Sequence, residues 1–268
     1  MNTKSLQTIR PGSGAVRVDR SRLPRHIPED DHWWFAGRTR ALRAVLEPHL
    51  PAGELFILDV GSGAGNMYHH LSRYGYVIGV ENHPNPVRVG RARGYDIRQA
   101  DARALPFADN TFDLVTALDV IEHNEDDVAI LREAHRVLKP GGLVLISVPA
   151  FQWLWSFNDE LNAHVRRYTR GDLERKLLCV GFSPVRQTYN NFLIFPVAAL
   201  TILLSRLRPP KALKSHYFED DAYQVDMVPT HPLVNAVLMG VGRLESYLIR
   251  FADLPVGTGL IALARKGE

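Results

Sequence analysis

The chain has little cysteine and no apolar run long enough to cross a membrane. Cys179 is the one cysteine among 268 residues. No disulfide can form within the chain, and a reducing cytoplasm is the expected location. Cys179 lies in a helical pattern, which favours a small core residue over a nucleophile. The apolar stretch 192–204 has thirteen positions, too few for a helix across about 30 Å of hydrocarbon.

Most of the chain also lacks net positive charge. Residues 1–28 hold six basic side chains and one acid, so the net charge of +3 leaves −2 on residues 29–268. The first segment has no apolar core, which excludes a signal peptide, and is expected to be a disordered basic tail. Residues 29–268 would form one domain without a basic face for nucleic acid. Attraction of the tail to phosphate or an anionic membrane stays open.

Three glycines at alternate positions follow the first strong strand pattern. An apolar run from Phe56 to Val60 leads to Gly61, Gly63 and Gly65. A strand, a glycine-rich turn and a helix bring backbone against a nucleoside ligand. A dinucleotide fingerprint, G-x-G-x-x-G, would place its third glycine at position 66, which is Asn66. This difference argues against an NAD-dependent oxidoreductase.

Acids follow the next two strand patterns. The run 76–80 ends in Glu81, 20 residues beyond Gly61, where nucleotide-binding folds place an acid on ribose hydroxyls. Asp101 follows the run 96–100, and further buried strand patterns begin at residues 112 and 143. Strand patterns alternating with helical ones predict a parallel sheet covered on both faces.

This ordered series resembles the class I S-adenosylmethionine-dependent methyltransferases, over about residues 54–190 and the C-terminal strand. The resemblance implies an α/β fold with a Rossmann-like seven-stranded sheet, mostly parallel with the last strand antiparallel, helices on both faces and a helical insertion before the last strand. It also implies S-adenosylmethionine as methyl donor and S-adenosylhomocysteine as product. The cofactor-binding positions carried over are Asp59, Gly61, Ser62, Gly63, Gly65, Asn66, Glu81, Asn82, Asp101, Ala102, Asp119 and Val120.

A leading helix is predicted between residues 29 and 50, because its apolar residues recur at helical intervals. In the related enzymes such a helix covers the cofactor site. Arg38 or Arg40 would then contact the methionine carboxylate, and Trp33 and Trp34 would line the acceptor pocket. The alternative is that the aromatic rings staple this helix to the sheet and the arginines are solvated.

Two histidines are candidates for the reacting centre. His123 follows the fourth strand pattern, and His164 lies in a polar cluster after the fifth. A neutral imidazole could act as general base for a hydroxyl acceptor. Arg166 and Arg167 could orient an anionic acceptor, with Tyr168 beside them. A hydrogen-bonded brace is the competing interpretation of His164 and Tyr168.

A metal is not expected, although one alternative remains. Asp119, Glu122, His123 and His164 resemble the metal cluster of ubiquinone-pathway O-methyltransferases and RNA 3′-end methyltransferases. Those patterns usually begin with Glu, where this chain has Asp119. Glu122 and His123 also occur as a structural pair in relatives without metal.

The connection 191–258 is far longer than the 2–5 residues usual for a hairpin, so it must fold by itself. One apolar helix is expected from Phe192 to Leu204, and a second from Pro232 to Phe251 has apolar spacing suited to packing on the first. The two would form a lid. Alternatively the first helix lies in a membrane surface, with its basic neighbours at the headgroups: Arg206, Arg208, Lys211 and Lys214.

The sequence thus predicts a cytoplasmic methyltransferase acting on oxygen of a small-molecule or lipid-linked acceptor. The segments 32–35, 164–168 and 254–257 are similar to those of a bacterial subgroup assigned to tailoring reactions, whose acceptors are undefined. Two alternatives remain: a cofactor-binding, membrane-peripheral partner protein without turnover, and an NAD-dependent oxidoreductase.

Overall fold

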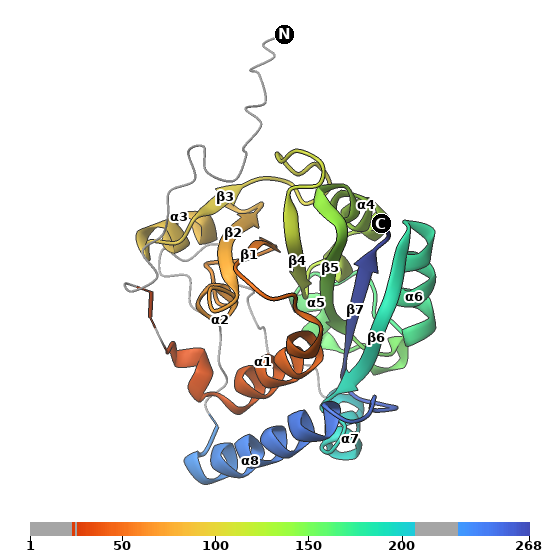
Figure 1. Cartoon of the computed structure of the whole chain (residues 1–268). Coiled ribbons are helices and arrows are strands. Elements are labelled where there is room, and N and C mark those ends of the chain that lie inside the picture. The colour runs from red at the N-terminus through yellow and green to blue at the C-terminus, as the bar shows by residue number, and fades with distance from the viewer. Residues whose placement is uncertain (1–22, 25, 207–229) are drawn as a thin grey trace.

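A seven-stranded sheet forms the centre of the molecule (Figure 1). The computed structural model describes residues 23–24, 26–206 and 230–268, so most of the predicted basic tail lies outside the described residues. The strands are ordered β3-β2-β1-β4-β5-β7-β6. Their bounds are β1 Leu55–Val60, β2 Gly75–Glu81, β3 Ile97–Gln99, β4 Phe112–Leu118, β5 Leu138–Pro149, β6 Phe182–Asn190 and β7 Gly259–Lys266.

The strand directions confirm the predicted fold class. β1 pairs in parallel with β2 and β4, and further parallel pairs join β2 to β3 and β4 to β5. β7 runs antiparallel to both β5 and β6. Continuous apolar runs suit such strands, because both faces of a parallel sheet are covered.

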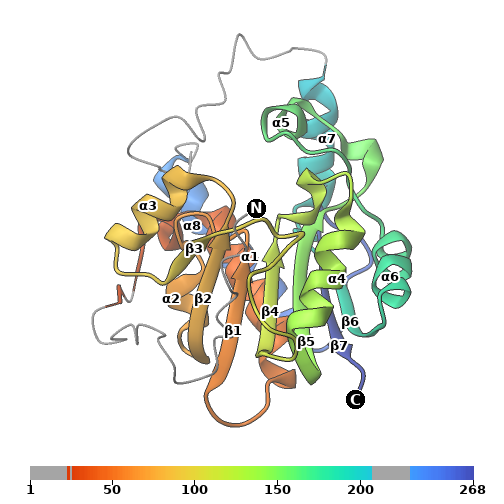
Figure 2. The same cartoon turned by 90° about the horizontal axis from the view of Figure 1, so that it is seen from above.

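Helices cover both faces of the sheet (Figure 2). One apolar core joins the sheet to α4 and α6, and the other joins it to α1, α2, α3 and α8. The helix bounds are α1 Trp33–Leu46, α2 Tyr68–Leu71, α3 Pro84–Ala92, α4 Asp127–Val137, α5 Phe157–Leu161, α6 Arg170–Cys179, α7 Phe195–Ser205 and α8 Pro232–Ile249. Single 3₁₀ turns are η2 Pro28–Asp31, η3 Glu47–His49, η4 Ile121–His123 and η5 Gln152–Leu154.

Side-chain caps fix the starts of α4 and α6. Asp126 accepts a hydrogen bond from the Ala129 N–H at 3.0 Å, and Thr169 and Asp172 form the predicted capping box of α6. The expectation of a buried cysteine is wrong. Cys179 is exposed, because it ends α6 on the side away from the buried residues Leu173 and Leu177.

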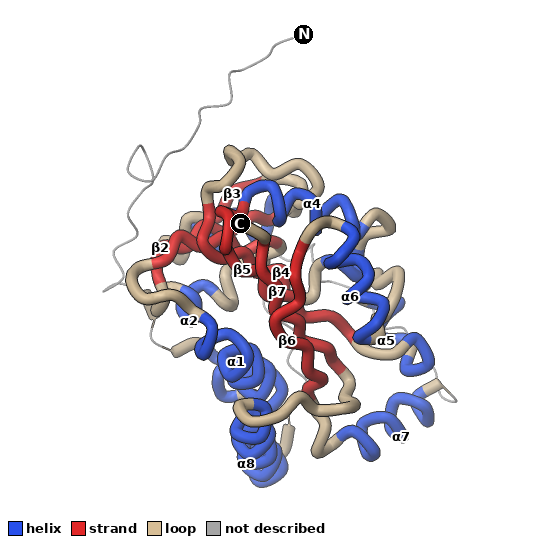
Figure 3. The backbone as a smooth tube through the Cα atoms, turned by 45° about the vertical axis from the view of Figure 1, so that its right-hand side comes forward, coloured by secondary structure: helices blue, strands red, loops and turns tan. Residues whose placement is uncertain are grey.

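The insertion 191–258 contains the two predicted helices, but they do not pack on each other as expected. α8 packs along α1, whereas α7 lies beside η5, and Figure 3 shows α7 and α8 apart from each other. The side chain of Asn235 fastens α8 to the start of α1: it accepts from the Trp33 N–H at 2.9 Å and donates to the Asp31 carbonyl at 2.8 Å. Among the described residues no helix is long and apolar enough to span a membrane.

Candidate functional site

The glycine turn lies where the strand order reverses. β1 has β2 on one side and β4 on the other, and ligands of open α/β sheets bind at such a point, beyond the carboxyl ends of the strands. Gly61, directly after β1, has φ +66°, and a Cβ there would collide with Val120 after β4. Glycine is therefore needed where the turn after β1 approaches the Val120 side chain in the loop after β4.

Glu81 and the glycine turn are in direct contact. One carboxylate oxygen of Glu81, Oε2, accepts a hydrogen bond from the Gly63 N–H at 3.1 Å, and Oε1 accepts from the His83 N–H at 2.9 Å. Gly63 itself has φ +54°. The carboxylate predicted to hold ribose hydroxyls is thus fixed against the backbone of the glycine turn.

Three polar groups around the turn are buried. The Ser62 hydroxyl and the Asn66 side-chain carbonyl have no hydrogen-bond partner in the described structure. Asp59, at the end of β1, accepts from the Thr116 hydroxyl at 2.6 Å, and burial raises its pKa to about 6. Orphaned buried groups beside a glycine turn fit a polar ligand that would complete their hydrogen bonds.

The third strand ends beside Glu81. The Ala100 N–H donates to the Glu81 carbonyl at 3.0 Å, which brings Asp101 and Ala102 to the same edge. The Asp101 carboxylate pairs with Arg103 at 2.7 Å, and the hydrogen bonds from Arg103 hold the pKa of Asp101 below its usual value. Asn82 is exposed at this edge.

Asp119 joins the leading helix to the site. It has φ +58° directly after β4. Its carboxylate pairs with Arg38 of α1 at 2.7 Å and accepts from the Ser147 hydroxyl of β5 at 2.6 Å. Arg38 therefore lies over the ends of β4 and β5. Arg40 instead points to Met239 of α8.

His123 and His164 come together although 41 residues separate them in the chain. Their rings meet edge to face with centroids 4.8 Å apart. Partial burial of the His123 ring, together with the nearby His164, lowers the pKa of His123. The residue nevertheless keeps an exposed side. Two histidines therefore share one side of the site.

Glu122 lies beneath the histidine pair and is fully buried. Neither oxygen of its carboxyl has a hydrogen-bond partner in the described part of the chain. Burial, together with nearby Asp119, raises its pKa well above the usual value. Glu122, His123 and His164 have potential ligand atoms within 4.8 Å of one another, whereas the carboxylate of Asp119 is occupied by Arg38 and Ser147.

His164 is held by a buried acid that the sequence interpretation did not select. Asp159 accepts from His164 Nδ1 at 2.9 Å and from two nitrogens of Arg167 at 2.7 and 2.8 Å. Burial alone would raise the pKa of Asp159, but these hydrogen bonds outweigh it and hold the pKa far below its usual value. Arg167 thus supports the histidine in this structure, where an anionic acceptor was expected.

Arg166 and Tyr168 converge on a second buried acid, Asp127. Its Oδ2 lies 3.2 Å from Arg166 and accepts from the Tyr168 hydroxyl at 2.7 Å, while Lys176 pairs with Oδ1 at 2.7 Å. Burial raises the pKa of Tyr168 far above its usual value. These contacts match the alternative interpretation of Tyr168 as part of a hydrogen-bonded brace. Sequence spacing could not reveal it, because the partners lie about forty residues away.

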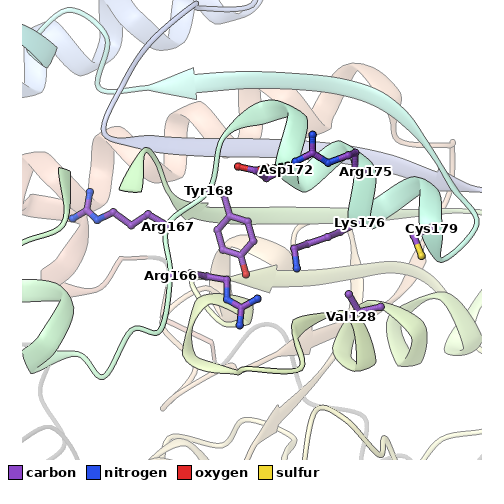
Figure 4. Close-up of a pocket in the computed structure, with 8 residues that line it drawn as sticks. All are labelled: Val128, Arg166, Arg167, Tyr168, Asp172, Arg175, Lys176 and Cys179. Atoms are coloured by element: carbon purple, nitrogen blue, oxygen red, sulfur yellow. Dashed lines mark hydrogen bonds and ion pairs between the residues drawn. The ribbon is translucent and has the colours of Figure 1, made fainter. Parts of the chain in front are cut away.

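A cavity of about 280 Å³ lies beside this brace, between α4 and α6 (Figure 4). In Figure 4 the Arg167 side chain extends away from Lys176 and Cys179. The cations at this cavity are paired with acids, Arg175 with Asp172 among them. The cavity is separate from the crevice between β1 and β4, which is the better place for a nucleoside.

The tryptophan pair lies at the start of α1, half-buried. Trp34 packs edge to face on Phe35 at 4.8 Å, and the Arg38 guanidinium lies 5.9 Å from the centre of the Trp34 ring. Trp34 is thereby close to the arginine that reaches Asp119. Trp33 is fixed through its backbone to Asn235 of the insertion.

Comparison with known proteins agrees with this geometry. Residues 58–146 match a family model described as a methyltransferase domain. A ubiquinone biosynthesis O-methyltransferase of Xanthomonas oryzae is 31% identical over 153 residues, covering 51% of this chain and 63% of the relative. A tRNA (carboxymethyluridine(34)-5-O)-methyltransferase of Macaca fascicularis is 29% identical over 162 residues, covering 57% of this chain and 23% of the relative. The matches therefore span less than two thirds of either relative.

Solved structures share the fold. The crystal structure of a putative methyltransferase from Bacillus halodurans superposes with a TM-score of 0.55 at 18% identity, covering 85% of this chain and 99% of that one. The matched domain 58–146 contains the glycine turn, Glu81, Asp101 and the end of β4. Residues 58–146 are thus a domain of the methyltransferase family, and the sheet has the fold of the class I S-adenosylmethionine-dependent methyltransferases, a family that uses S-adenosylmethionine as methyl donor.

Proposed function

We propose that this protein transfers a methyl group from S-adenosylmethionine to an oxygen of a small-molecule or lipid-linked acceptor. The supporting observation is the contact of Glu81 with the Gly63 N–H at the crevice between β1 and β4. It joins the glycine turn to the acid that would hold the ribose. The sole cysteine supports a cytoplasmic location.

The residues at the crevice fit the cofactor. Glu81 would accept from the ribose hydroxyls, Asp101 would lie near the adenine amino group, and Arg38 would meet the methionine carboxylate. The Ser62 hydroxyl and Asn66 carbonyl are buried without partners and would gain polar contacts. When bound, the cofactor supplies an electrophilic methyl group on a sulfonium.

His164 is the proposed general base. Because its Nδ1 is engaged by Asp159, its Nε2 is the nitrogen that would take the proton of an acceptor hydroxyl. The ionised Asp159 would orient the ring and stabilise the imidazolium that forms. Arg167 and the Ser156 N–H in turn hold Asp159. This arrangement favours oxygen as the methylated atom, since a hydroxyl must lose a proton.

The surface of the insertion supports a lipid-linked acceptor at an anionic membrane. Large apolar side chains are exposed on α7, on α8 and just after α8: Val197, Leu200, Leu203 and Leu204, then Leu233, Val234, Val237, Leu244 and Tyr247, and finally Phe251. The one acid on these two helices, Glu245, is buried. The exposed side chains that carry charge are basic, with Arg206 and Arg250 at the helix ends. Such surfaces bind anionic lipid.

α7 also reaches the site side of the molecule. Arg206, at its end, donates to the Trp155 carbonyl at 2.8 Å and to the Trp153 carbonyl, in the β5–α5 connection that leads to Asp159. A membrane held by α7 and α8 would therefore bring a lipid-linked hydroxyl near the crevice.

Calorimetric titration of the purified protein with S-adenosylhomocysteine tests the proposal. One equivalent is expected to bind, because the product shares the nucleoside and amino-acid parts of the donor. NAD titrated in the same way serves as the comparison. Folded protein that binds no S-adenosylhomocysteine would overturn the proposal, and binding of NAD instead would favour an oxidoreductase.

A further inference from the structure

A second cluster of metal-type ligands lies outside the crevice. Asp30, in η2, faces two consecutive histidines of α2. Its Oδ1 lies 2.8 Å from His70 Nε2, and its Oδ2 lies 3.1 Å from His69 Nε2. The potential ligand atoms of the three residues all fall within 4.8 Å of one another. Two segments about forty residues apart thus direct a carboxylate and two imidazoles at one point.

The protonation states of these groups suit a cation. Burial, with the neighbouring His69, lowers the pKa of His70 to about 4, and burial also lowers the pKa of His69. Both imidazoles are therefore neutral near pH 7, as a metal ligand must be. Burial alone would raise the pKa of Asp30, but His70 and the Ile27 N–H outweigh it. Asp30 is accordingly ionised.

Hydrogen bonding leaves both histidines incompletely satisfied. The side chains of His69 and His70 are 1% and 10% exposed, and neither Nδ1 atom has a partner in the described structure. The centroids of the two imidazole rings lie 3.7 Å apart. Two adjacent buried imidazoles with half their polar atoms unpaired are costly if they only fill space. Among the described residues no donor faces either Nδ1, so each ring can carry its proton there and turn the Nε2 lone pair toward a metal.

A fourth ligand is available from the same segment. His26 lies four residues before Asp30, ahead of η2, and its Nδ1 lies 3.6 Å from Asp30 Oδ2. Its Nε2 contacts Asp31 at 2.9 Å. His26 is exposed, so its ring can move the short distance that a ligand position requires.

We propose that Asp30, His69 and His70 bind one divalent cation of the zinc type, with His26 completing a tetrahedral set. Zn²⁺ accepts imidazole nitrogen and carboxylate oxygen, and four protein ligands are typical of a structural site. The ion would clamp the segment 26–31 onto α2. Because the Tyr68 N–H donates to the Gly65 carbonyl at 3.0 Å, this clamp would also steady the glycine turn.

Metal analysis of the full chain, produced without a histidine tag and dialysed against Zn²⁺ and then metal-free buffer, tests the proposal. One equivalent of zinc per chain is expected to remain. Asp30→Asn and His70→Ala should each weaken zinc binding about tenfold or more. Zn²⁺ should raise the unfolding temperature of the wild-type protein and not that of Asp30→Asn. Asp30→Asn keeps the shape of the side chain, so its fold can be verified by circular dichroism.

Two matched variants locate the ion. His123→Ala with His164→Ala removes the histidines of the other candidate triple, and zinc retained by this double variant supports the proposal. His83→Ala, at an exposed histidine after β2, should leave binding unchanged. Wild-type protein that retains no zinc, or folded Asp30→Asn that retains a full equivalent, would overturn the proposal. Zinc lost only from the His123/His164 variant would overturn it as well.

Discussion

At the scale of single residues, the candidate site is organised by carboxylates and their donors. Glu81 accepts from two backbone N–H groups and is the proposed partner of the ribose. Glu81→Ala removes the acceptor and leaves the Gly63 N–H unpaired, so we expect the affinity for S-adenosylhomocysteine to fall about tenfold or more, or at least about 1.4 kcal/mol. Calorimetry measures this change.

Glu54 offers a matched control for that measurement. It is an exposed glutamate just before β1, at the opposite end of that strand from the glycine turn. Glu54→Ala should leave the affinity unchanged. Equal affinities of wild-type and Glu81→Ala protein would remove Glu81 from the ribose role.

Glu122 gives a pH dependence of stability. Its pKa in the folded protein is raised by burial, so the folded state holds a proton that the unfolded state releases above its ordinary pKa. Stability is therefore lost as the pH rises above that ordinary value. Glu122→Gln removes this penalty, and we expect a higher unfolding temperature at pH 7, by about 2–4 °C for each kcal/mol gained.

Thermal unfolding at several pH values checks the sign. The advantage of Glu122→Gln should shrink toward pH 4, where the wild-type carboxyl is protonated in both states. An unfolding temperature at pH 7 that is equal to or below that of the wild type would contradict a protonated, buried Glu122.

The sequence predicted the positions of some candidate site residues but not the contacts of others. The places of Glu81 and the glycine turn in the fold could be predicted, because both follow strand ends at a spacing that the sheet geometry sets. Their role in cofactor binding stays a prediction. Arg167 and Tyr168 were predicted to contact substrate, and this stays untested. In the structure they bond to Asp159 and Asp127. Long side chains choose among distant partners, and no local spacing encodes that choice.

At the scale of elements, the insertion shows that apolar spacing predicts a helix but not the element on which the helix packs. The apolar spacing of residues 232–251 correctly indicated a helix that needs a partner. The spacing could not identify the packing partner, since an apolar helix face can pack on any other apolar face. α8 packs on α1, and Asn235 contributes two hydrogen bonds to that contact.

Glu245 holds the start of the insertion to α8. Its carboxylate accepts from the Asn191 N–H at 2.6 Å and from the Leu193 N–H at 3.0 Å. Glu245→Ala leaves both donors without this acceptor, so we expect a loss of about 1–3 kcal/mol in the free energy of unfolding. Glu245→Gln keeps one acceptor and should lose less. Chemical denaturation and amide exchange at residues 191 and 193 measure the effect.

Ser246 provides the control for this comparison. In the described part of the chain its hydroxyl bonds to the Arg243 carbonyl, within α8 itself, so Ser246→Ala should change the free energy of unfolding by less than about 0.5 kcal/mol. If Glu245→Ala behaved like Ser246→Ala, the carboxylate would have no part in holding the turn before α7.

At the scale of the whole molecule, α7 and α8, which carry the exposed apolar residues, lie at the same end of the protein (Figure 1). The proposed cofactor site is formed by other elements, at the carboxyl ends of β1 and β4. A membrane bound at α7 and α8 would leave that site open to a lipid headgroup. A second copy of the chain on the same surface is the competing occupant, and it would instead cover the apolar residues in solution.

Flotation with vesicles of phosphatidylcholine and phosphatidylserine separates these occupants. We expect wild-type protein to float with the vesicles and less of it to float at high salt, because screening weakens the attraction of the arginines. Replacing Val197 and Leu200 together by serine removes apolar area worth about 1.5–3 kcal/mol per fully buried side chain. The membrane partition coefficient should therefore fall about tenfold or more.

Leu178 supplies the control, because it is equally exposed but lies on α6, away from the insertion. Leu178→Ser should float as the wild type does. Wild-type protein that stays in the soluble fraction would contradict the membrane proposal. A dimer in sedimentation that Val197→Ser with Leu200→Ser dissociates would assign the surface to a second copy. Retained flotation by that variant would show that α7 does not carry the lipid contact, and the same pair of substitutions at Val237 and Tyr247 would then test α8.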